Sequence, residues 1–276
     1  MSKNVALITG ATDGIGKAVA RKLLVEGWRV VIVGRNPQRC DATVAELQAA
    51  VPNSEISAIT ANLTLMRDTR QAIEKFLAQH ASLDFLFLNA NAIAQQRIVT
   101  PEGFESNFAL GHLSRALMAL KLEPVLKATP GSQIMTVVGL NTEKLDYADV
   151  TIVRNYTSAK ALARWQWSTR VFTKKYNTVS PVAMNAYIPG LVRTKILANE
   201  PQPMRLVVKI MNLAIGIPVE KSAENVFTAL NDVIKNQRRD AVYQWKDVKP
   251  SHARNMTSDD PQLLWDGTNQ LLAPYL

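Results

Sequence analysis

Cysteine and histidine are scarce in this chain of 276 residues, which contains one cysteine and three histidines. Because Cys40 has no second cysteine to pair with, the sequence excludes a disulfide-stabilised scaffold, and we expect a reducing, cytoplasmic environment. His80, His112 and His252 stand too far apart in sequence to form a metal-binding pattern, so we predict no metal site.

Long apolar runs are also missing. The first, Val5–Ile8, meets Gly10 almost at once and is too short for the apolar region of a signal peptide. The longest later region, Leu206–Val219, is interrupted by Lys209 and Pro218. We therefore expect neither a signal peptide nor a membrane-spanning helix.

Nucleic-acid-binding motifs are absent despite a net charge of +9. The basic residues are dispersed, and there is no zinc finger, homeodomain or aromatic-basic RNA motif, so we predict no nucleic-acid partner. The charge favours either a solvated basic surface or attraction to something acidic, such as a dinucleotide, an anionic bilayer or an acidic carrier protein.

What the sequence does contain is a regular alternation of short β-branched runs and longer amphipathic segments. The predicted strands, several of them apolar throughout, are Val5–Thr9, Arg29–Gly34, Glu55–Ala61, Leu83–Asn89, Gln133–Gly139 and Val182–Ile188. The predicted helices are Ile15–Glu26, Pro37–Ala50, Arg67–Gln79, Glu102–Leu126 and Arg154–Lys175. Continuous apolar strands alternating with helices predict an α/β fold, a Rossmann-like doubly wound parallel sheet with helices on both faces, in a single domain.

The first predicted strand runs into the sequence TGATDGIG, Thr9–Gly16. Gly10, Gly14 and Gly16 allow a tight turn, a close backbone approach and a helix start, and the amides of that helix end can bind a pyrophosphate. A strand before the motif and a helix after it are the context that a dinucleotide site requires. We predict such a site; a glycine-rich turn without a ligand is the alternative.

The second predicted strand ends in Val33-Gly34-Arg35-Asn36. Dinucleotide folds bind the ribose 2′-hydroxyl of NAD through an acidic residue near this point, whereas an arginine accommodates the 2′-phosphate of NADP. Positions 33 to 38 contain no Asp or Glu, and Arg35 and Arg39 are present. We therefore predict NADP(H); a merely solvated Arg35 is the alternative.

The sequence RNYTSAKALA, Arg154 to Ala163, places Tyr156 and Lys160 four residues apart, on the same side of a predicted helix. A nearby ammonium lowers a tyrosine pKa of about 10 by roughly one to three units, toward a range useful for proton transfer. Two polar residues that share a helix surface are the alternative interpretation.

Together these motifs resemble the short-chain dehydrogenase/reductase family. Further matches follow the third, fourth and sixth predicted strands: Asn62-Leu63-Thr64, Leu88-Asn89-Ala90-Asn91, and Ile188 to Thr194. The segments at 102–113 and 243–265 look like the retinol dehydrogenase and protochlorophyllide reductase branch. The resemblance runs from about position 5 to about position 272.

The resemblance implies an NADP-dependent oxidoreductase in which Tyr156 is the general acid or base and Lys160 also binds the nicotinamide ribose. It divides the chain into a dinucleotide-binding core (1–194), a substrate lid (195–219) and a C-terminal helix, last strand and tail (220–276). The implied cofactor-binding residues are Gly10, Thr12, Asp13, Gly14, Ile15, Gly16, Arg35, Asn36, Asn62, Leu63, Asn89, Lys160, Pro189, Gly190 and Thr194.

Two positions depart from the family's catalytic tetrad. The usual serine, which donates a hydrogen bond to the substrate oxygen, falls on Val138-Gly139, and the usual asparagine falls on Gly111. Losing such a donor typically costs about 10²–10³ in rate. An atypical tetrad that keeps Tyr156 and Lys160 is therefore expected.

Polar residues near these positions are candidates to replace the missing side chains. Asn141, Thr142 and Ser114 are candidates for the serine, and we choose Thr142 because its separation from Tyr156 is close to that common in the family. Asn107, one turn before Gly111, is the local substitute for the asparagine.

Two functions are compatible with these departures. The first is an NADPH-dependent reductase or dehydrogenase of a lipophilic carbonyl or alcohol. The second is the family's scaffold used for non-redox chemistry (cyclisation, elimination, hydrolysis or condensation) or as a non-catalytic binding partner. The lid segment is apolar with Lys195, Arg205 and Lys209 on its rim, which suits a lipophilic, possibly carrier-bound substrate or peripheral membrane contact.

The sequence ARWQW, Ala163–Trp167, lies on the helix that pairs subunits in the family. The resemblance therefore implies a homodimer through the fourth and fifth helices, with these aromatic side chains buried against a partner helix. It also implies a structural role for His112.

Overall fold

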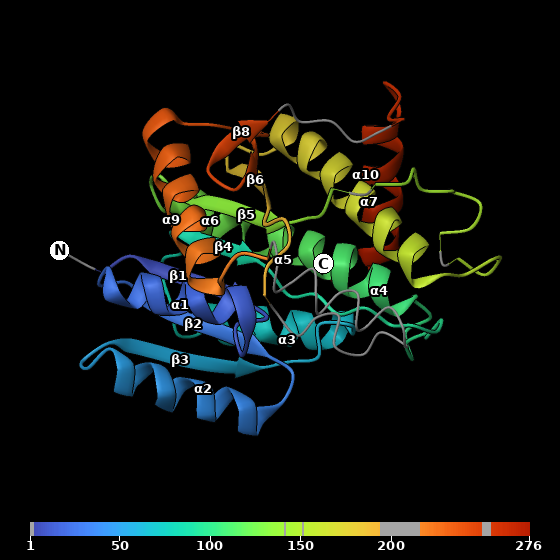
Figure 1. Ribbon diagram of the computed structural model, residues 1–276. Helices are drawn as coiled ribbons and strands as arrows, with labels where there is room; N and C mark the ends of the chain where they lie inside the picture. The colour runs from blue at the N-terminus through green and yellow to red at the C-terminus, as the bar shows by residue number, and fades with distance from the viewer. Residues whose placement is uncertain (1–2, 141, 151, 194–215, 250–254) are drawn as a thin grey trace.

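The computed structural model describes residues 3–140, 142–150, 152–193, 216–249 and 255–276. Their strands form one sheet in the order β3-β2-β1-β4-β5-β6-β7-β8, parallel except for β8 (Figure 1). The strands are β1 Val5–Thr9, β2 Arg29–Gly34, β3 Glu55–Thr60, β4 Phe85–Leu88, β5 Gln133–Val137, β6 Ala183–Ile188, β7 Val242–Gln244 and β8 Asp247–Lys249.

Helices cover both faces of this sheet, as Figure 1 shows. They are α1 Gly14–Val25, α2 Pro37–Ala50, α3 Met66–Leu77, α4 Ser106–Phe108, the π-helical turn η1 Ala109–Leu113, α5 Ser114–Lys121, α6 Glu123–Ala128, α7 Ser158–Val179, α9 Val219–Asn236 and α10 Asp260–Leu272. Helices α1, α2 and α9 pack on one face, and α3, α5 and α7 on the other.

The two cores follow from the alternation of side chains along each strand. In β1, Leu7 belongs to the same buried cluster as Phe76 and Phe172 on one face, whereas Ile8 belongs to the cluster of Leu23 and Val226 on the other. Since successive residues of a strand point to opposite faces, a strand that is apolar throughout can bury both. The predicted doubly wound α/β fold is confirmed.

Two predicted helices differ from those observed. The helix expected over Glu102–Leu126 is divided into α4, η1, α5 and α6; η1 contains Gly111, and Pro124 lies in the first turn of α6. The helix expected from Arg154 begins instead at Ser158.

The later start of α7 has a local cause. Thr157 is the N-cap residue, and its hydroxyl oxygen accepts a hydrogen bond from the Lys160 amide at 3.1 Å. Asn155 just before it has a φ of 53°, outside the helical region. Tyr156 therefore lies in the loop before the helix, and the prediction that it shares a helical face with Lys160 was wrong.

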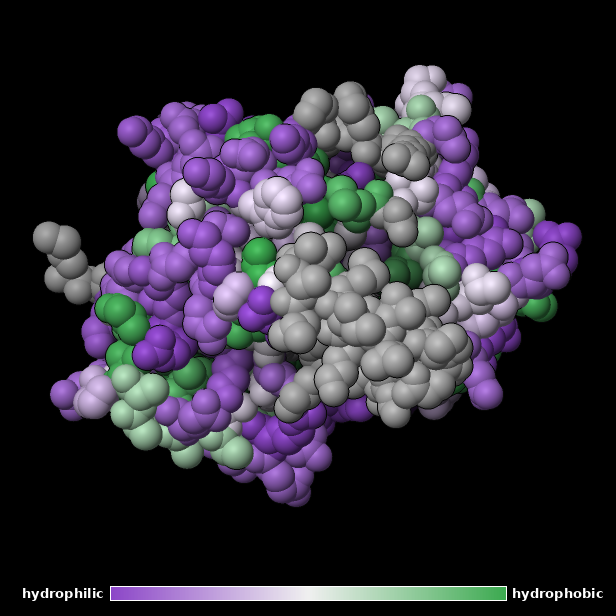
Figure 2. All heavy atoms as spheres, in the orientation of Figure 1, coloured by the Kyte–Doolittle hydropathy of each residue, from purple (hydrophilic) through white to green (hydrophobic). Residues whose placement is uncertain are grey.

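The predicted lid falls mostly outside the described residues, as does the cofactor candidate Thr194. Among the described helices, none is long and apolar enough to cross a membrane. In the view of Figure 2 the described surface is mostly hydrophilic, and its hydrophobic residues form small separate groups.

Candidate active site

A cavity of about 520 Å³ lies at the carboxyl ends of the central strands. Its lining includes Gly10 after β1, Asn89 after β4, Val138 after β5 and Pro189 after β6. Between β1 and β4 the strand order reverses direction, and open α/β sheets bind their ligands at this point. The volume lies within the range of about 300–1,000 Å³ common for small-molecule sites.

The glycine loop brings backbone close to backbone beside this cavity. Gly10 has a φ of +66°, and a Cβ there would lie 2.7 Å from Ala90 Cα. A Cβ on Gly16 would lie 2.6 Å from the Asn89 Nδ2. That nitrogen donates to the carbonyl oxygens of Thr9 and Gly10, both at 3.1 Å, which ties the loop to the end of β4. The start of α1 thus faces the cavity, as pyrophosphate binding requires.

The arginines after β2 are placed differently from each other. Arg35 is exposed and outside the cavity lining, whereas Arg39 on α2 lines the cavity, with its Nη2 3.4 Å from an oxygen of Asp13. Asn36 caps α2 by accepting a hydrogen bond from the Arg39 amide at 2.8 Å. Of these two arginines, Arg39 is the one that lines the cavity.

The structure brings just over half of the predicted cofactor-binding residues together around the cavity. Those in the lining are Gly10, Thr12, Asp13, Gly14, Ile15, Asn89, Pro189 and Gly190. Those described but outside the lining are Gly16, which supports the loop from behind, and Arg35, Asn36, Asn62, Leu63 and Lys160.

Tyr156 is also outside the cavity lining. Its hydroxyl donates to the carbonyl oxygen of Ala94 and accepts from the Asn107 Nδ2, each at 2.8 Å. Burial, followed by the negative charge of Glu105, raises the pKa of Tyr156, against the lowering effect of the Asn107 hydrogen bond. The predicted lowering by the Lys160 ammonium was wrong, because the pKa of the phenol is raised and the cation that partly opposes this is Arg97, not Lys160.

Asn107, the local substitute predicted for the asparagine, contacts the tyrosine. Its Nδ2 also donates to Glu105 Oε1 at 2.8 Å, and its Oδ1 accepts from the Ala94 amide at 3.0 Å. The Glu105 carboxylate is fully buried and caps α4 by accepting from the amides of Asn107 and Phe108. Asn107 thus fixes the distance between Ala94 and Tyr156.

The two described residues proposed to replace the serine, Ser114 and Thr142, do not line the cavity. The Ser114 hydroxyl donates to the Leu110 carbonyl within its own helix at 2.8 Å. Thr142 lies outside the lining, with its hydroxyl oxygen buried and without a hydrogen-bond partner among the described residues. Asn141 falls outside the described residues.

Two neighbouring side chains of α7 occupy the space above the two glycines. A Cβ on Gly139 would lie 2.8 Å from both Cδ and Nε2 of Gln166, and a Cβ on Gly111 would lie 2.6 Å from Cγ of Trp165. Gln166 and Trp165 both line the cavity. The sequence signal for them was the loss of a side chain at each glycine, but nothing local paired those losses with α7.

The tryptophans of ARWQW were expected to pack against a partner helix, and this was wrong. Trp165 and Trp167 are 1% and 0% exposed in the single chain. The outer side of α7 is covered by the chain's own α10, where Trp265 stacks on Phe172 with ring centroids 5.2 Å apart.

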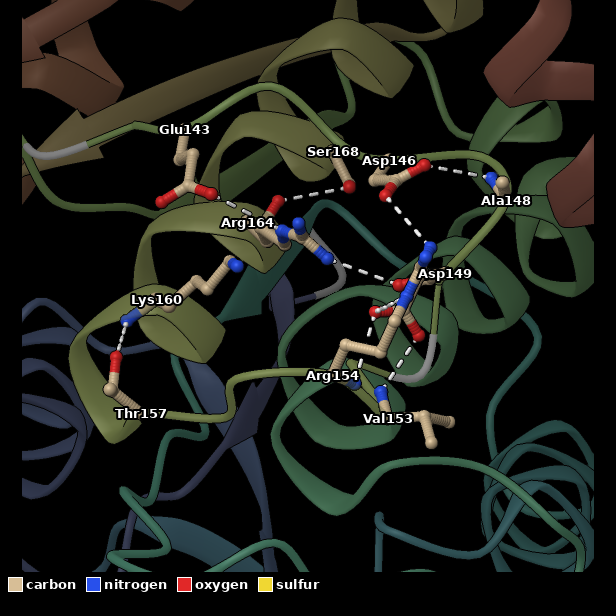
Figure 3. A network of polar contacts seen from close by, with 10 residues as sticks. All are labelled: Glu143, Asp146, Ala148, Asp149, Val153, Arg154, Thr157, Lys160, Arg164 and Ser168. Carbon is tan, nitrogen blue, oxygen red and sulfur yellow. Dashed lines mark hydrogen bonds and ion pairs between the residues drawn. The ribbon is translucent and has the colours of Figure 1, made fainter.

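The loop from β5 to α7 is held to the helix by a network of polar contacts (Figure 3). Arg164 Nη1 donates to the Asp149 carbonyl oxygen at 3.1 Å, and Arg164 pairs with Glu143 at 3.4 Å. The Asp149 carboxylate accepts from the Val153 amide at 2.7 Å, and this bond lowers the pKa of that carboxyl. The segment that carries Tyr156 is therefore fixed to the helix that carries Gln166.

Comparison with known proteins identifies similar sequences. The family model described as short chain dehydrogenase matches residues 4–205. A human polyprenol dehydrogenase is 26% identical over 90% of this chain and 79% of that protein. Human retinol dehydrogenase 13 and retinol dehydrogenase 12 of Mus musculus are 27% and 30% identical over 69% and 71% of this chain. This chain spans 59% and 63% of the length of those two retinol dehydrogenases.

Solved structures share the fold at low sequence identity. An alcohol dehydrogenase from the archaeon Thermococcus sibiricus, complexed with 5-hydroxy-NADP, has a TM-score of 0.66 at 20% identity, covering 92% of this chain and 100% of that chain. Levodione reductase has a TM-score of 0.71 at 17% identity, covering 87% and 95%.

Proposed function

The chain belongs to the short-chain dehydrogenase/reductase family, and on that premise we propose that it is an NADPH-dependent reductase or dehydrogenase of a lipophilic carbonyl or alcohol. The observation that carries the proposal is the glycine loop beside the cavity, where added Cβ atoms at Gly10 and Gly16 would collide with their surroundings. Such close backbone approach, at the N-terminus of α1, fits a pyrophosphate. A nicotinamide dinucleotide bound there supplies or accepts the hydride.

A lipophilic substrate is supported by the apolar part of the cavity lining and by the names of similar proteins. The apolar residues of the lining include Ile93, Val137, Val138, Leu162, Leu191 and Val192. The similar proteins are named polyprenol and retinol dehydrogenases, and both names denote apolar alcohols. Apolar lining with few polar groups favours a ligand of this kind.

Tyr156 is the group that we propose protonates the substrate oxygen during reduction. Its hydroxyl first gives up the hydrogen bond to the Ala94 carbonyl and then donates its proton to the substrate, while Asn107 continues to donate to the phenol oxygen. The resulting phenolate is stabilised by the Asn107 amide, because hydrogen bonds to the charged form favour it.

The preference for NADPH rests on cationic groups at the adenosine end of the cavity. Arg39 lines the cavity, Arg35 lies just before α2, and positions 33 to 38 contain no acidic side chain that would accept a hydrogen bond from a ribose hydroxyl. A planar guanidinium suits a phosphate because it can form two parallel hydrogen bonds to it.

Calorimetric titration with NADPH and with NADH tests the cofactor proposal directly. We expect micromolar binding of NADPH and much weaker binding of NADH. Replacing Arg39 or Arg35 with Ala should weaken NADPH binding by about tenfold or more, the value of a hydrogen bond to a charged group, and leave NADH binding nearly unchanged. The matched control is Arg21→Ala, an exposed arginine of α1 outside the cavity lining. No binding of either dinucleotide would contradict the proposal.

Non-redox chemistry or a purely binding role is the second candidate. It is favoured by the Tyr156 hydroxyl, which is turned onto Ala94, and by the two glycines at tetrad positions. Tight NADPH binding without NADPH oxidation in the presence of retinal, decanal or other apolar carbonyls would support it over the reductase.

A further inference from the structure

Consecutive residues of α7 compensate for the two missing tetrad side chains. Gln166 fills the space that a side chain on Gly139 would enter, and Trp165 fills the space that a side chain on Gly111 would enter. Gly139 has no positive φ that would itself demand glycine, so the reason for its missing side chain is the presence of Gln166.

One polar atom of each of these residues is buried and has no partner among the described residues. Gln166 is 5% exposed, and its Oε1 makes no hydrogen bond to any described residue; the same is true of Trp165 Nε1. Burying a polar atom without a hydrogen bond costs free energy. Both residues line the cavity, where a ligand can supply a hydrogen-bond partner. An amide carries both a donor and an acceptor, and rotation about its last bond exchanges them.

Trp165, the neighbour of Gln166 in α7, is held from behind. The Arg115 guanidinium lies over the Trp165 ring at 4.8 Å and donates to the Ala90 carbonyl oxygen at 2.9 Å, to the Thr136 hydroxyl at 2.8 Å and to the Val137 carbonyl oxygen. These acceptors lie at the ends of β4 and β5, so the arginine ties α7 to the strand ends that form the cavity floor. A fixed donor costs little reorganisation during a reaction.

We propose that Gln166 is the catalytic residue that donates a hydrogen bond to the substrate oxygen in place of the missing serine. The inference rests on the proposed function, because it assigns the group that polarises the carbonyl in that same cavity. No bond to hydrogen breaks at Gln166: its Nε2–H stabilises the charge that develops on the oxygen, and the proton itself comes from Tyr156.

Placing a hydroxyl donor at position 139 in a variant without Gln166 distinguishes hydrogen bonding by Gln166 from its packing. Gln166→Leu removes the amide at similar volume. The double variant Gly139→Ser/Gln166→Ala introduces a hydroxyl donor at position 139 in the space that Gln166 leaves. The double variant Gly139→Ala/Gln166→Ala is the control that lacks the hydroxyl. The readouts are kcat with NADPH and decanal, calorimetric NADPH affinity, and the affinity of the enzyme–NADPH complex for decanamide, an unreactive carbonyl mimic followed by NADPH fluorescence.

We expect Gln166→Leu to lower kcat by about 10²–10³, as for loss of one oxyanion donor. Decanamide affinity should fall by about tenfold, the value of one hydrogen bond, with NADPH affinity unchanged. The serine double variant should recover most of both losses, and the alanine double variant should not.

Any one of four results would overturn the inference. Equal kcat for wild type and Gln166→Leu, or equal recovery in both double variants, would leave Gln166 as packing while the reductase proposal stands. If the wild-type protein does not bind NADPH, or oxidises NADPH with none of the apolar carbonyls tested, the proposed function fails and this inference fails with it.

Discussion

The hydroxyl of Tyr156 is surrounded by a carbonyl oxygen and an amide nitrogen, with the buried Glu105 carboxylate close behind. An ammonium would favour the phenolate, whereas burial and a negative charge disfavour it. The pKa of Tyr156 is consequently raised, and the side chain is suited to hold a proton rather than to accept one. This favours action as an acid, in the direction of carbonyl reduction.

The pH profile of reduction tests this description. Reduction needs the protonated phenol, which is present below its pKa and lost as the pH rises through it. Because the pKa lies above its ordinary value of about 10, kcat for decanal reduction should stay level through pH 9. Loss of rate between about pH 7 and pH 9 would instead indicate a tyrosine whose pKa is lowered by a cation, as the spacing to Lys160 first suggested.

Removing the phenol hydroxyl gives the matching kinetic prediction. Tyr156→Phe should lower kcat by about 10²–10⁴, the usual contribution of a positioned acid, without changing NADPH affinity by calorimetry. The variant keeps the ring and loses only the bonds to Ala94 and Asn107. An unchanged kcat would exclude Tyr156 as the proton donor.

At the scale of elements, the strand-to-helix connection at Gly10 determines the geometry of the cofactor end of the cavity. A side chain there meets two obstacles, since its φ of +66° is unfavourable for other residues and the Cβ would lie 2.7 Å from Ala90 Cα. The close approach of this connection to the end of β4 therefore requires glycine at position 10.

Paired glycine substitutions test this dependence. Gly10→Ala should destabilise the fold by about 2 kcal/mol or more, through backbone strain and overlap, and should abolish NADPH binding. Gly267→Ala in α10 is the control, since nothing lies within 4 Å of the added Cβ. It should stabilise by about 0.5–1 kcal/mol, the helix propensity difference. Denaturant unfolding measures both, and a Gly10→Ala protein as stable as wild type would contradict the account.

At the scale of the whole molecule, the C-terminal helix α10 is locked onto η1 and α7. His112 Nε2 is 2.9 Å from the Thr268 hydroxyl oxygen, and the imidazole lies between Phe108 and Phe172. Burial, followed by the charge of Arg115, lowers the pKa of His112 to about 3. The structural role implied for this histidine is consistent with that position; the homodimer stays a prediction.

Acid should therefore destabilise the protein partly through His112. Its pKa falls from about 6.5 unfolded to about 3 folded, so the stabilisation is fully present above pH 6.5 and is lost as the pH falls below it. Between pH 7 and pH 5 this amounts to about 1–2 kcal/mol. Denaturant unfolding of wild type and His112→Gln at both pH values measures the difference, and the same pH dependence in both proteins would contradict it.

Local patterns in the sequence determined the layers of the fold and the location of the site. Strands, helices and the glycine loop are encoded by neighbouring residues, because side-chain periodicity and turn chemistry act over a few positions. For that reason the strand ends, the loop at Gly10 and the position of the cavity were predictable. The start of α7 was not, because the cap at Thr157 and the φ of Asn155 outweighed the helical pattern.

The residues that surround Tyr156 and the two glycines of the candidate site could be identified only from the tertiary structure. Asn107 and Ala94 reach Tyr156 from 49 and 62 residues away, and Gln166 and Trp165 come from another helix to fill the gaps above Gly139 and Gly111. Packing at this density couples a lost side chain to whichever distant residue enters its volume. The spacing of Tyr156 and Lys160 indicated a candidate active-site segment, whereas burial and the distant Glu105 raise the pKa of Tyr156.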